Sequence, residues 1–538
     1  MSSNPSDTPL IYDSTLRDGA QALGITFSQT GKIRFAHLLD QFGIPYLEGG
    51  FAGSNDRDMQ FFRDAAKEQF SQIKIVSFGS TRRVGVKVEE DPFLQALLRA
   101  GTPAVAIYGK AAPLHVREVL RTDLDENLDL ISESIAFLKE HGLEVHFDAE
   151  HFFDGYKEDS DYALKVLHRA QEAGADSLVL CDTNGGMLPR QLGAIVERVR
   201  RELPGILLGI HPHNDCGMGV ANAIEGYMAG ARMIQGCFNG YGERTGNANL
   251  TTIIPTLQLK LGAMVTTPEK LTMLRSLSRA VDDLVNQTPD LRAPYVGDAA
   301  FAHKAGAHVS GIRHNPSSFE HCPPEAVGNR RNVLLSELSG ASNVLYRLKQ
   351  SGSESNPDSL WKDAVKRILA SLKDREGAGY SFESADASFR ILVQKALGEH
   401  QPFFELESFR VTVERRGTDA QCLSEATVKL RVKGQTELTV GEGVGPVEAL
   451  DMALRKALSK FYPEIAKIVL TDFRVRILDP REATNATTRV LIESTDGTAS
   501  WGTVGVSPNI IEASWQALLD SIEYKLLPRA AKSAESDR

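Results

Sequence analysis

Cysteine is scarce in this sequence of 538 residues. The five cysteines are Cys181, Cys216, Cys237, Cys322 and Cys422, an odd number in which no two stand at a zinc-ligand spacing such as C-x2-C. This usage excludes zinc-ribbon and disulfide-scaffold proteins, and we expect five free thiols in a reducing compartment. Cys181 and Cys237 lie in apolar runs, where a free cysteine packs as a small hydrophobic residue.

Long apolar runs and an excess of positive charge are also absent. No apolar stretch reaches the roughly 20 residues that a membrane helix needs, and the polar start, Met1–Pro9, has no apolar signal core. The formal net charge of -10 would repel phosphates, and basic residues gather only in short pairs such as Arg82-Arg83 and Arg330-Arg331. We therefore expect a cytoplasmic protein that binds neither membranes nor nucleic acid.

The first half of the chain instead contains a regular alternation of short apolar, β-branched runs with amphipathic stretches. Helical periodicity marks stretches such as Gln29–Phe42, Leu124–His141 and Asp159–Ala173. The eight apolar runs are Leu10–Tyr12, Tyr46–Phe51, Ile73–Phe78, Ala104–Tyr108, Leu143–Phe147, Ser177–Cys181, Ile206–Ile210 and Met233–Phe238. Eight strand–helix units predict an α/β fold, a (β/α)8 TIM barrel over residues 1–265. A doubly wound open sheet is the alternative, which the even spacing disfavours.

The pattern changes after residue 265. Helical stretches over 267–286 and 359–396, separated by a proline-rich region and a polar linker at Ser351–Asp358, predict mostly helical linking subdomains over residues 266–400. Two strand-rich units, each closed by a helix, then predict an α+β domain with an internal pseudo-twofold repeat over residues 401–528. We expect a disordered tail over 529–538.

The strand-rich units of this third region are defined by their residue ranges. Strands at 407–414 and 425–432 precede a helix at 446–460, and strands at 469–478, 489–493 and 499–506 precede a helix at 509–526. We interpret the run Gly441–Gly445 as a structural turn and not as a phosphate loop, because it lacks the full dinucleotide fingerprint.

The strongest chemical signal is the pair His211 and His213 at the end of the seventh predicted strand. Residues i and i+2 of an extended segment point to the same side, so both imidazoles can face the barrel axis. Asp18 follows the first strand in the same predicted ring. Imidazole ligands suit zinc, manganese, iron or cobalt, and added carboxylate and amide ligands favour Mn²⁺ and Mg²⁺. We predict a metal site here; packing of two buried histidines is the alternative.

Arg17 stands beside Asp18 and has two interpretations. The guanidinium can form a purely structural ion pair with an acid, or its fixed positive fork can stabilise a developing oxyanion at the catalytic mouth of the barrel. The second interpretation is favoured because other polar residues follow the same ends of the predicted strands.

Three motifs resemble the 2-isopropylmalate synthase, homocitrate synthase and citramalate synthase family of metal-dependent TIM-barrel Claisen condensation enzymes. They are Asp13–Gln21 (DSTLRDGAQ), His211–Asp215 (HPHND) and Asn239–Asn247 (NGYGERTGN). The segment Ala300–His308 is similar to the family's linking subdomain, and residues 401–528 resemble its regulatory domain. The resemblance covers nearly the whole chain.

The resemblance implies roles for individual residues. The metal ligands would be Asp18, His211, His213 and Asn247; the catalytic residues would be Arg17, Glu150 and His308, with His308 donated across a dimer; Arg17, Gln21, Asp148, Glu150 and Thr183 would bind substrate. It also implies a divalent metal (Mn²⁺, Mg²⁺ or Zn²⁺), a homodimer, and an amino-acid effector on the regulatory domain.

The segments Glu48–Asn55 and Phe147–Tyr156 look most like the longer citramalate synthases of this family. The implied reaction joins acetyl-CoA to pyruvate to give (R)-citramalate and CoA in isoleucine biosynthesis, with isoleucine as effector. The alternatives are 2-isopropylmalate synthesis from 2-oxoisovalerate, with leucine as effector, and homocitrate synthesis. A metal-dependent lyase or aldolase, or an amino-acid sensor with an inactive barrel, are alternatives of other classes.

Overall fold

The computed structural model describes residues 8–303, 306–333, 359–382, 385–415, 422–478, 482 and 485–527. The expected linker Ser351–Asp358 and the expected tail 529–538 lie outside these residues. Contacts divide the chain into two units, one of Met1–Phe301 with His321–Arg331 and one of Ala302–Glu320 with Asn332–Arg538. Among the described residues, none of the helices combines the length and the apolar character that a membrane span requires.

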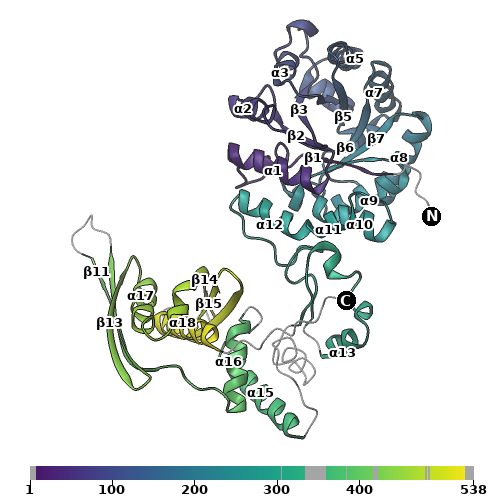
Figure 1. The fold of residues 1–538 in the computed structure, drawn as a ribbon. Helices are drawn as coiled ribbons and strands as arrows, with labels where there is room; N and C mark the ends of the chain where they lie inside the picture. Colours follow the sequence, from purple (N-terminus) through teal and green to yellow (C-terminus); the bar gives the residue numbers. More distant parts are fainter. Residues whose placement is uncertain are drawn as a thin grey trace. The chain divides into compact units, whose positions relative to one another are not determined.

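Eight parallel strands close into a barrel in the order of the sequence, which confirms the predicted TIM barrel (Figure 1). Each strand lies within a few residues of its predicted apolar run. The strands are β1 (Leu10–Asp13), β2 (Tyr46–Phe51), β3 (Lys74–Ser80), β4 (Ala104–Lys110), β5 (Glu144–Glu150), β6 (Ser177–Asp182), β7 (Leu207–Pro212) and β8 (Met233–Gly236). β1 pairs with both β2 and β8, so no edge strand remains.

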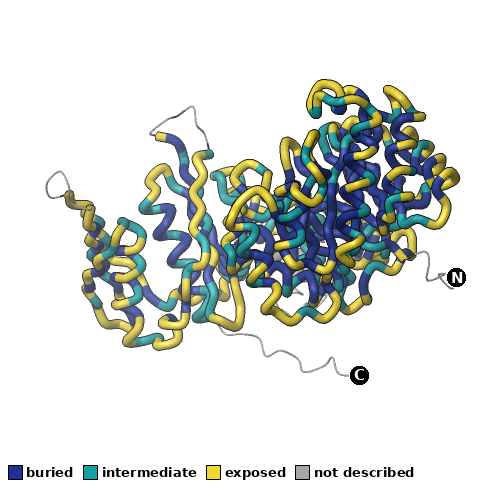
Figure 2. The backbone as a smooth tube through the Cα atoms, turned by 90° about the horizontal axis from the view of Figure 1, so that it is seen from above, coloured by how far each residue is buried: buried dark blue, intermediate teal, exposed yellow. Residues whose placement is uncertain are grey.

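Helices surround the strands and bury their apolar faces against them (Figure 1). They are α1 (Gln29–Phe42), α2 (Asp56–Ala65), α3 (Pro92–Ala100), α4 (Pro113–His115), α5 (Leu124–Glu140), α6 (Phe152–Glu158), α7 (Ser160–Glu172), α8 (Pro189–Glu202), α9 (Gly219–Ala229) and α10 (Leu250–Leu261). Local signals set their ends: the Ser28 side chain caps the start of α1, and Gly43 ends it at φ 104°. In Figure 2 the strands at the centre of the barrel are dark blue and the surrounding loops mostly yellow.

The predicted helical stretch over 267–286 is two helices, α11 (Pro268–Leu271) and α12 (Leu274–Leu284), both in the barrel unit. The second unit begins with β9 (Ala302–His303), α13 (Gly306–His314) and β10 (Asn332–Val333). The predicted stretch over 359–396 is likewise two helices, α15 (Ser359–Gly377) and α16 (Asp386–Leu397).

The rest of the second unit contains the predicted pseudo-repeat. Each of two antiparallel three-stranded sheets is followed by one helix. The first repeat has β11 (Glu405–Glu414), β12 (Leu423–Val432), β13 (Gln435–Gly443) and α17 (Pro446–Leu458); the second has β14 (Val469–Ile477), β15 (Thr488–Thr495), β16 (Ser500–Ser507) and α18 (Ile510–Leu526). Both helices bury their apolar faces in one shared core.

The interpretation of Gly441–Gly445 as a turn was wrong for its first three residues, which form the end of β13. A side chain is excluded there by close packing, because a Cβ at Gly441 would lie 2.4 Å from the backbone nitrogen of Ala453. Glycine therefore lets α17 pack directly on the strand, a requirement that the sequence displays only as a glycine-rich run.

Candidate metal centre at the barrel mouth

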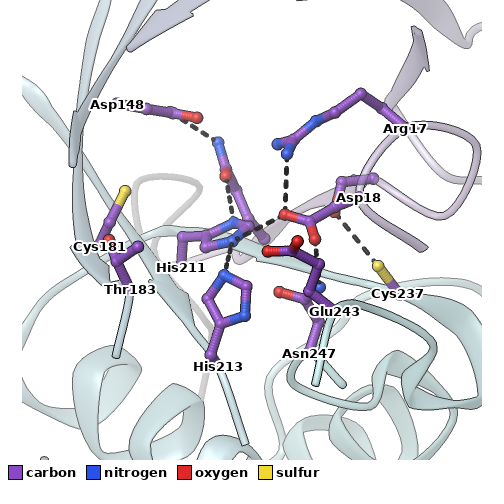
Figure 3. A network of polar contacts seen from close by, with 12 residues as sticks. Arg17, Asp18, Asp148, Cys181, Thr183, His211, His213, Cys237, Glu243 and Asn247 are labelled. Atoms are coloured by element: carbon purple, nitrogen blue, oxygen red, sulfur yellow. Dashed lines mark hydrogen bonds and ion pairs between the residues drawn. The ribbon is translucent and has the colours of Figure 1, made fainter. Parts of the chain in front are cut away.

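The carboxyl ends of β1 and β7 bring Asp18, His211 and His213 together (Figure 3). One ligand atom from each lies within 4.8 Å of the others. Nε2 of His211 is 3.3 Å from Nε2 of His213 and 3.4 Å from Oδ2 of Asp18. All three side chains are buried. The alternating direction of strand residues thus places both imidazoles on the same side, as predicted.

The electrostatics of this cluster suit a cation. Burial, followed by the neighbouring His211, lowers the pKa of His213 to about 3, so its imidazole is neutral and can act as a ligand. The pKa of Asp18 is lowered: burial opposes its charge, but Arg17 and the two histidines outweigh that effect. For His211, burial is the largest single effect and lowers the pKa, but the hydrogen bond to Asp18 and the charges of Asp18 and Asp148 together raise the pKa above its usual value.

Gln235 on β8 fixes the orientation of His211. Its Oε1 lies 2.8 Å from Nδ1 of His211, and its Nε2 donates to Asp148 at 3.2 Å. When Nδ1 carries the proton, Nε2 of His211 turns its lone pair toward Asp18 and His213. Such partners set the tautomer of metal-binding histidines in proteins. Burial, followed by repulsion from Glu48, raises the pKa of Asp148 to about 7.

Asn247 completes the cluster on the side of Asp18. Its Nδ2 donates to Oδ1 of Asp18 at 2.9 Å, and its segment pairs with His213 in an isolated bridge. The amide oxygen Oδ1 of Asn247 is buried and has no hydrogen-bond partner among the residues that the structure describes. A buried unpaired acceptor next to two imidazoles and a carboxylate fits a bound divalent cation, which would satisfy it.

Arg17 is held in one orientation beside Asp18, one of the candidate metal ligands. Its Nε donates to Glu48 at 2.7 Å and its Nη1 donates to Asp18 at 2.9 Å, while the guanidinium carbon lies 3.8 Å from the ring centre of Phe78. Burial opposes its charge, but Glu48 and Asp18 raise the pKa of Arg17 above its usual value. Arg17 is therefore a fixed positive charge at the barrel mouth.

The other predicted site residues lie in several places. Asp148 and Glu150 lie on β5, and Thr183 follows β6, where its hydroxyl accepts a hydrogen bond from the His151 amide at 2.8 Å. Gln21 is exposed at the end of the short helix Gly19–Gln21. His308 lies in the second unit, on α13, with its exposed ring stacked on Phe319 at a centroid distance of 4.3 Å.

Three residues at the mouth were not among the predicted site residues. Gln235 orients His211, Glu48 accepts hydrogen bonds from both Arg17 and the Tyr12 hydroxyl, and Lys110 forms an ion pair with Glu150. Glu48 carried a signal, because it is a charged residue within an otherwise apolar strand. Gln235 lies within an ordinary apolar run, and nothing in the sequence pattern indicated that it has a functional role.

Comparisons with known proteins agree with this geometry. Residues 8–281 match the family model described as HMGL-like, residues 295–376 match the homocitrate synthase post-HMGL domain-like model, and residues 383–526 match the LeuA allosteric (dimerisation) domain. These three models follow one another along the chain in the order of the predicted barrel, linking region and regulatory domain.

Among curated proteins, the (R)-citramalate synthase of Synechocystis sp. is 51% identical over 530 residues, which cover 96% of this chain and 96% of that protein. The (R)-citramalate synthase of Geobacter sulfurreducens is 50% identical over 517 residues, or 96% of this chain and 97% of its own length. That of Aquifex aeolicus is 48% identical, with the same coverage. The chain is thus an HMGL-like enzyme and belongs to the family of the (R)-citramalate synthases, which confirms the family resemblance of its motifs.

Proposed function

We propose that this chain is an acyltransferase that condenses acetyl-CoA with pyruvate to give (R)-citramalate and CoA, in isoleucine biosynthesis. The identity of about half of all residues to curated (R)-citramalate synthases, over 96% of the chain, carries this proposal. The buried cluster of Asp18, His211 and His213 at the catalytic end of the barrel supports it.

We assign the metal ligands as Asp18, His211, His213 and Asn247, and the ion as Mn²⁺, Mg²⁺ or Zn²⁺. When bound, such an ion supplies a Lewis acid that polarises the 2-oxo acid and orients it. The ligands themselves contribute a low-charge, buried environment: one carboxylate, two imidazoles and one amide oxygen. The unpaired Oδ1 of Asn247 supports its place in the set.

The reaction forms one carbon–carbon bond between the acetyl methyl carbon and the keto carbon of pyruvate. A base, Glu150 or His308, removes a methyl proton, and Arg17 stabilises the negative charge on the enolate oxygen. The new alkoxide takes up a proton, and water then cleaves the thioester to release CoA. Asp148, Thr183 and Gln21 contact the 2-oxo acid in this proposal. The fixed guanidinium of Arg17 supports its role, because it needs no reorganisation as charge develops.

We further propose that residues 1–265 form the catalytic domain, 266–400 the linking subdomains and 401–528 a regulatory domain of a homodimer, in which His308 serves the partner's barrel. The match of residues 383–526 to an allosteric dimerisation domain supports this organisation. Isoleucine, the end product of the route, is the proposed effector. Calorimetry that detects binding of leucine but not isoleucine would contradict this assignment.

A panel of 2-oxo acids mixed with acetyl-CoA and Mn²⁺ tests the function, with CoA thiol release as the readout. We expect the highest kcat/KM with pyruvate and (R)-citramalate as the product. A strong preference for 2-oxoisovalerate would assign 2-isopropylmalate synthesis instead. Absence of thiol release with every 2-oxo acid, together with cleavage of a 3-hydroxyacyl-CoA, would assign a lyase.

A further inference from the structure

The segment Asn239–Asn247, which carries the proposed ligand Asn247, has an unusual backbone. Two of its non-glycine residues, Asn239 (φ 56°) and Arg244 (φ 57°), adopt left-handed conformations. Gly246 (φ 98°) approaches the chain so closely that a Cβ would lie 2.1 Å from the carbonyl oxygen of Gly240. Such a backbone persists only where the surroundings hold it, and strain of this kind clusters at functional sites.

The side chain of Asn239 is held at all of its polar atoms. Its Nδ2 donates to the Ser278 carbonyl at 2.8 Å and to Oδ1 of Asp282 at 2.6 Å. Its Oδ1 accepts from the hydroxyl of Thr251 at 3.1 Å and from that of Ser278 at 2.7 Å. Asn239 therefore ties the start of the segment to helices α10 and α12, outside the barrel strands.

The same carboxylate oxygen of Asp282 also accepts a hydrogen bond from the hydroxyl of Tyr241. Asp282 is 6% exposed, and it lies more than forty residues from both partners, which are 43 and 41 positions away. One oxygen of α12 thus fixes two residues of the segment, 239 and 241. Tyr241 in turn presents its carbonyl 3.5 Å from Nδ2 of Asn247, the atom that also donates to Asp18.

The surroundings of this contact explain why hydrogen bonds must hold the segment. A cavity of about 200 Å³ lies beside it, lined by Asn239, Tyr241 and Asp282 among others. Close packing is therefore missing on this side, and the carboxylate supplies the fixation that apolar contacts supply elsewhere.

We propose that Asp282 is a positioning residue for the metal site, acting through Asn239 and Tyr241 to aim Asn247 at Asp18, His211 and His213. The inference rests on the metal ligands assigned under the proposed function. In this proposal Asp282 is neither a metal ligand nor a substrate contact. Its removal frees the segment 239–247, so that the ion loses a correctly placed amide ligand while the other three ligands remain.

Titration of Mn²⁺ into the metal-free, full-length chain tests the role of Asp282, with Asp282→Ala as the variant. We expect its dissociation constant for Mn²⁺ to rise about 10- to 100-fold, the usual consequence of losing a group that orients a ligand. Saturating Mn²⁺ should restore kcat to within a few-fold, because Asp282 takes no part in the chemistry. Asp283→Asn is the matched control: this neighbour on α12 is exposed, and its removal should leave Mn²⁺ affinity unchanged.

Tyr241→Phe removes one of the two hydrogen bonds and keeps the carboxylate, and it serves if Asp282→Ala does not fold. We expect a rise in the Mn²⁺ dissociation constant of about three- to tenfold, in line with the loss of one hydrogen bond. The Mn²⁺ dissociation constant of Asp282→Asn should lie between those of wild type and Asp282→Ala, because the amide oxygen of asparagine can still accept a hydrogen bond.

The outcomes separate the two proposals. If wild type binds Mn²⁺ but Asp282→Ala and Tyr241→Phe bind it equally well, then Asp282 has only a structural role and the inference is overturned, even where the melting temperature falls. If wild type binds no Mn²⁺, or if Asp18→Asn binds Mn²⁺ as tightly as wild type, the metal site of the proposed function is wrong instead.

Discussion

Two buried histidines inside the same barrel show how the environment distinguishes a candidate metal ligand from a packing residue. His146 lies near the amino-terminal end of β5, where its Nδ1 is 2.8 Å from the Ser177 hydroxyl and its ring makes T-shaped contacts with the rings of Tyr12 and Tyr46. His211 lies at the opposite, carboxyl end of β7, beside a carboxylate and a second imidazole. Both are buried, so burial alone does not distinguish them.

The difference lies in what faces the second ring nitrogen. Nε2 of His146 has Glu144 3.6 Å away, beyond hydrogen-bond distance, and burial lowers its pKa to about 4. Nε2 of His211 lies near Nε2 of His213 and Oδ2 of Asp18, and its Nδ1 is fixed by Gln235. A buried histidine indicates a metal site when its free nitrogen converges with other donors. The predictions below are ordered by the size of the expected effect.

Replacement of the two histidines should give the largest contrast. We expect His211→Ala to abolish stoichiometric metal binding and to lower kcat/KM for pyruvate at least about a thousandfold, because Lewis-acid stabilisation of several kcal/mol is lost. His146→Gln should bind metal and turn over like wild type. Thiol release and metal analysis after dialysis measure both. Equal losses of metal binding and of kcat/KM in the two variants would contradict the distinction between His211 as a ligand and His146 as a packing residue.

A substitution at Arg17 tests whether catalysis requires the fixed geometry of the guanidinium or only its positive charge. Arg17→Lys keeps a cation but cannot hold Glu48 and Asp18 with one rigid fork. We expect kcat to fall about 100- to 1,000-fold, the range found when one oxyanion donor is removed, with Mn²⁺ affinity changed by far less. Parallel kinetics and Mn²⁺ titration check this. A variant that loses metal affinity but keeps kcat at saturating Mn²⁺ would show that Arg17 serves the metal site alone.

The comparison of His211 with His146 can also be tested by removing the residue that contacts Nδ1 of each ring. Gln235→Leu takes away the acceptor that orients His211, and we expect the Mn²⁺ dissociation constant to rise about 10- to 100-fold. Ser177→Ala removes the corresponding partner of His146 and is the matched control, for which we expect unchanged Mn²⁺ affinity. Calorimetric titration distinguishes them. Unchanged affinity in Gln235→Leu would mean that His211 is oriented by its strand alone.

The sequence predicted the strands and the convergence of His211 with His213 because both depend on local periodicity. Eight apolar runs define the barrel, and the i, i+2 spacing of His211 and His213 places them on one side of β7. The residue pairs that orient these groups join positions far apart in the chain: Gln235 with Asp148, Asp282 with Asn239, and Glu48 with Arg17. Such contacts depend on barrel closure and on the packing of α12, which no local pattern encodes.

The same limit explains the misplaced turn in the second unit. A glycine run signals conformational freedom, but Gly441 is needed because α17 packs on its strand. That requirement belongs to a helix later in the chain. The local composition therefore indicated that the segment requires glycine, but it did not indicate that the segment is the end of a strand.

The smallest expected effect is on stability and concerns His146. Its pKa of about 4 in the folded chain lies below the value of about 6.5 in an unfolded chain. The unfolded chain therefore binds more protons between these values, and the contribution of this residue to stability is complete above pH 6.5 and is lost as the pH falls toward 4. From pH 7 to pH 5 the loss is about 2 kcal/mol. His146→Gln, which does not titrate, should lose correspondingly less stability over this range, as measured by urea unfolding of the barrel at both pH values. Parallel pH profiles for wild type and variant would show that His146 is protonated in the folded barrel, and the contrast with His211 would then rest on geometry alone.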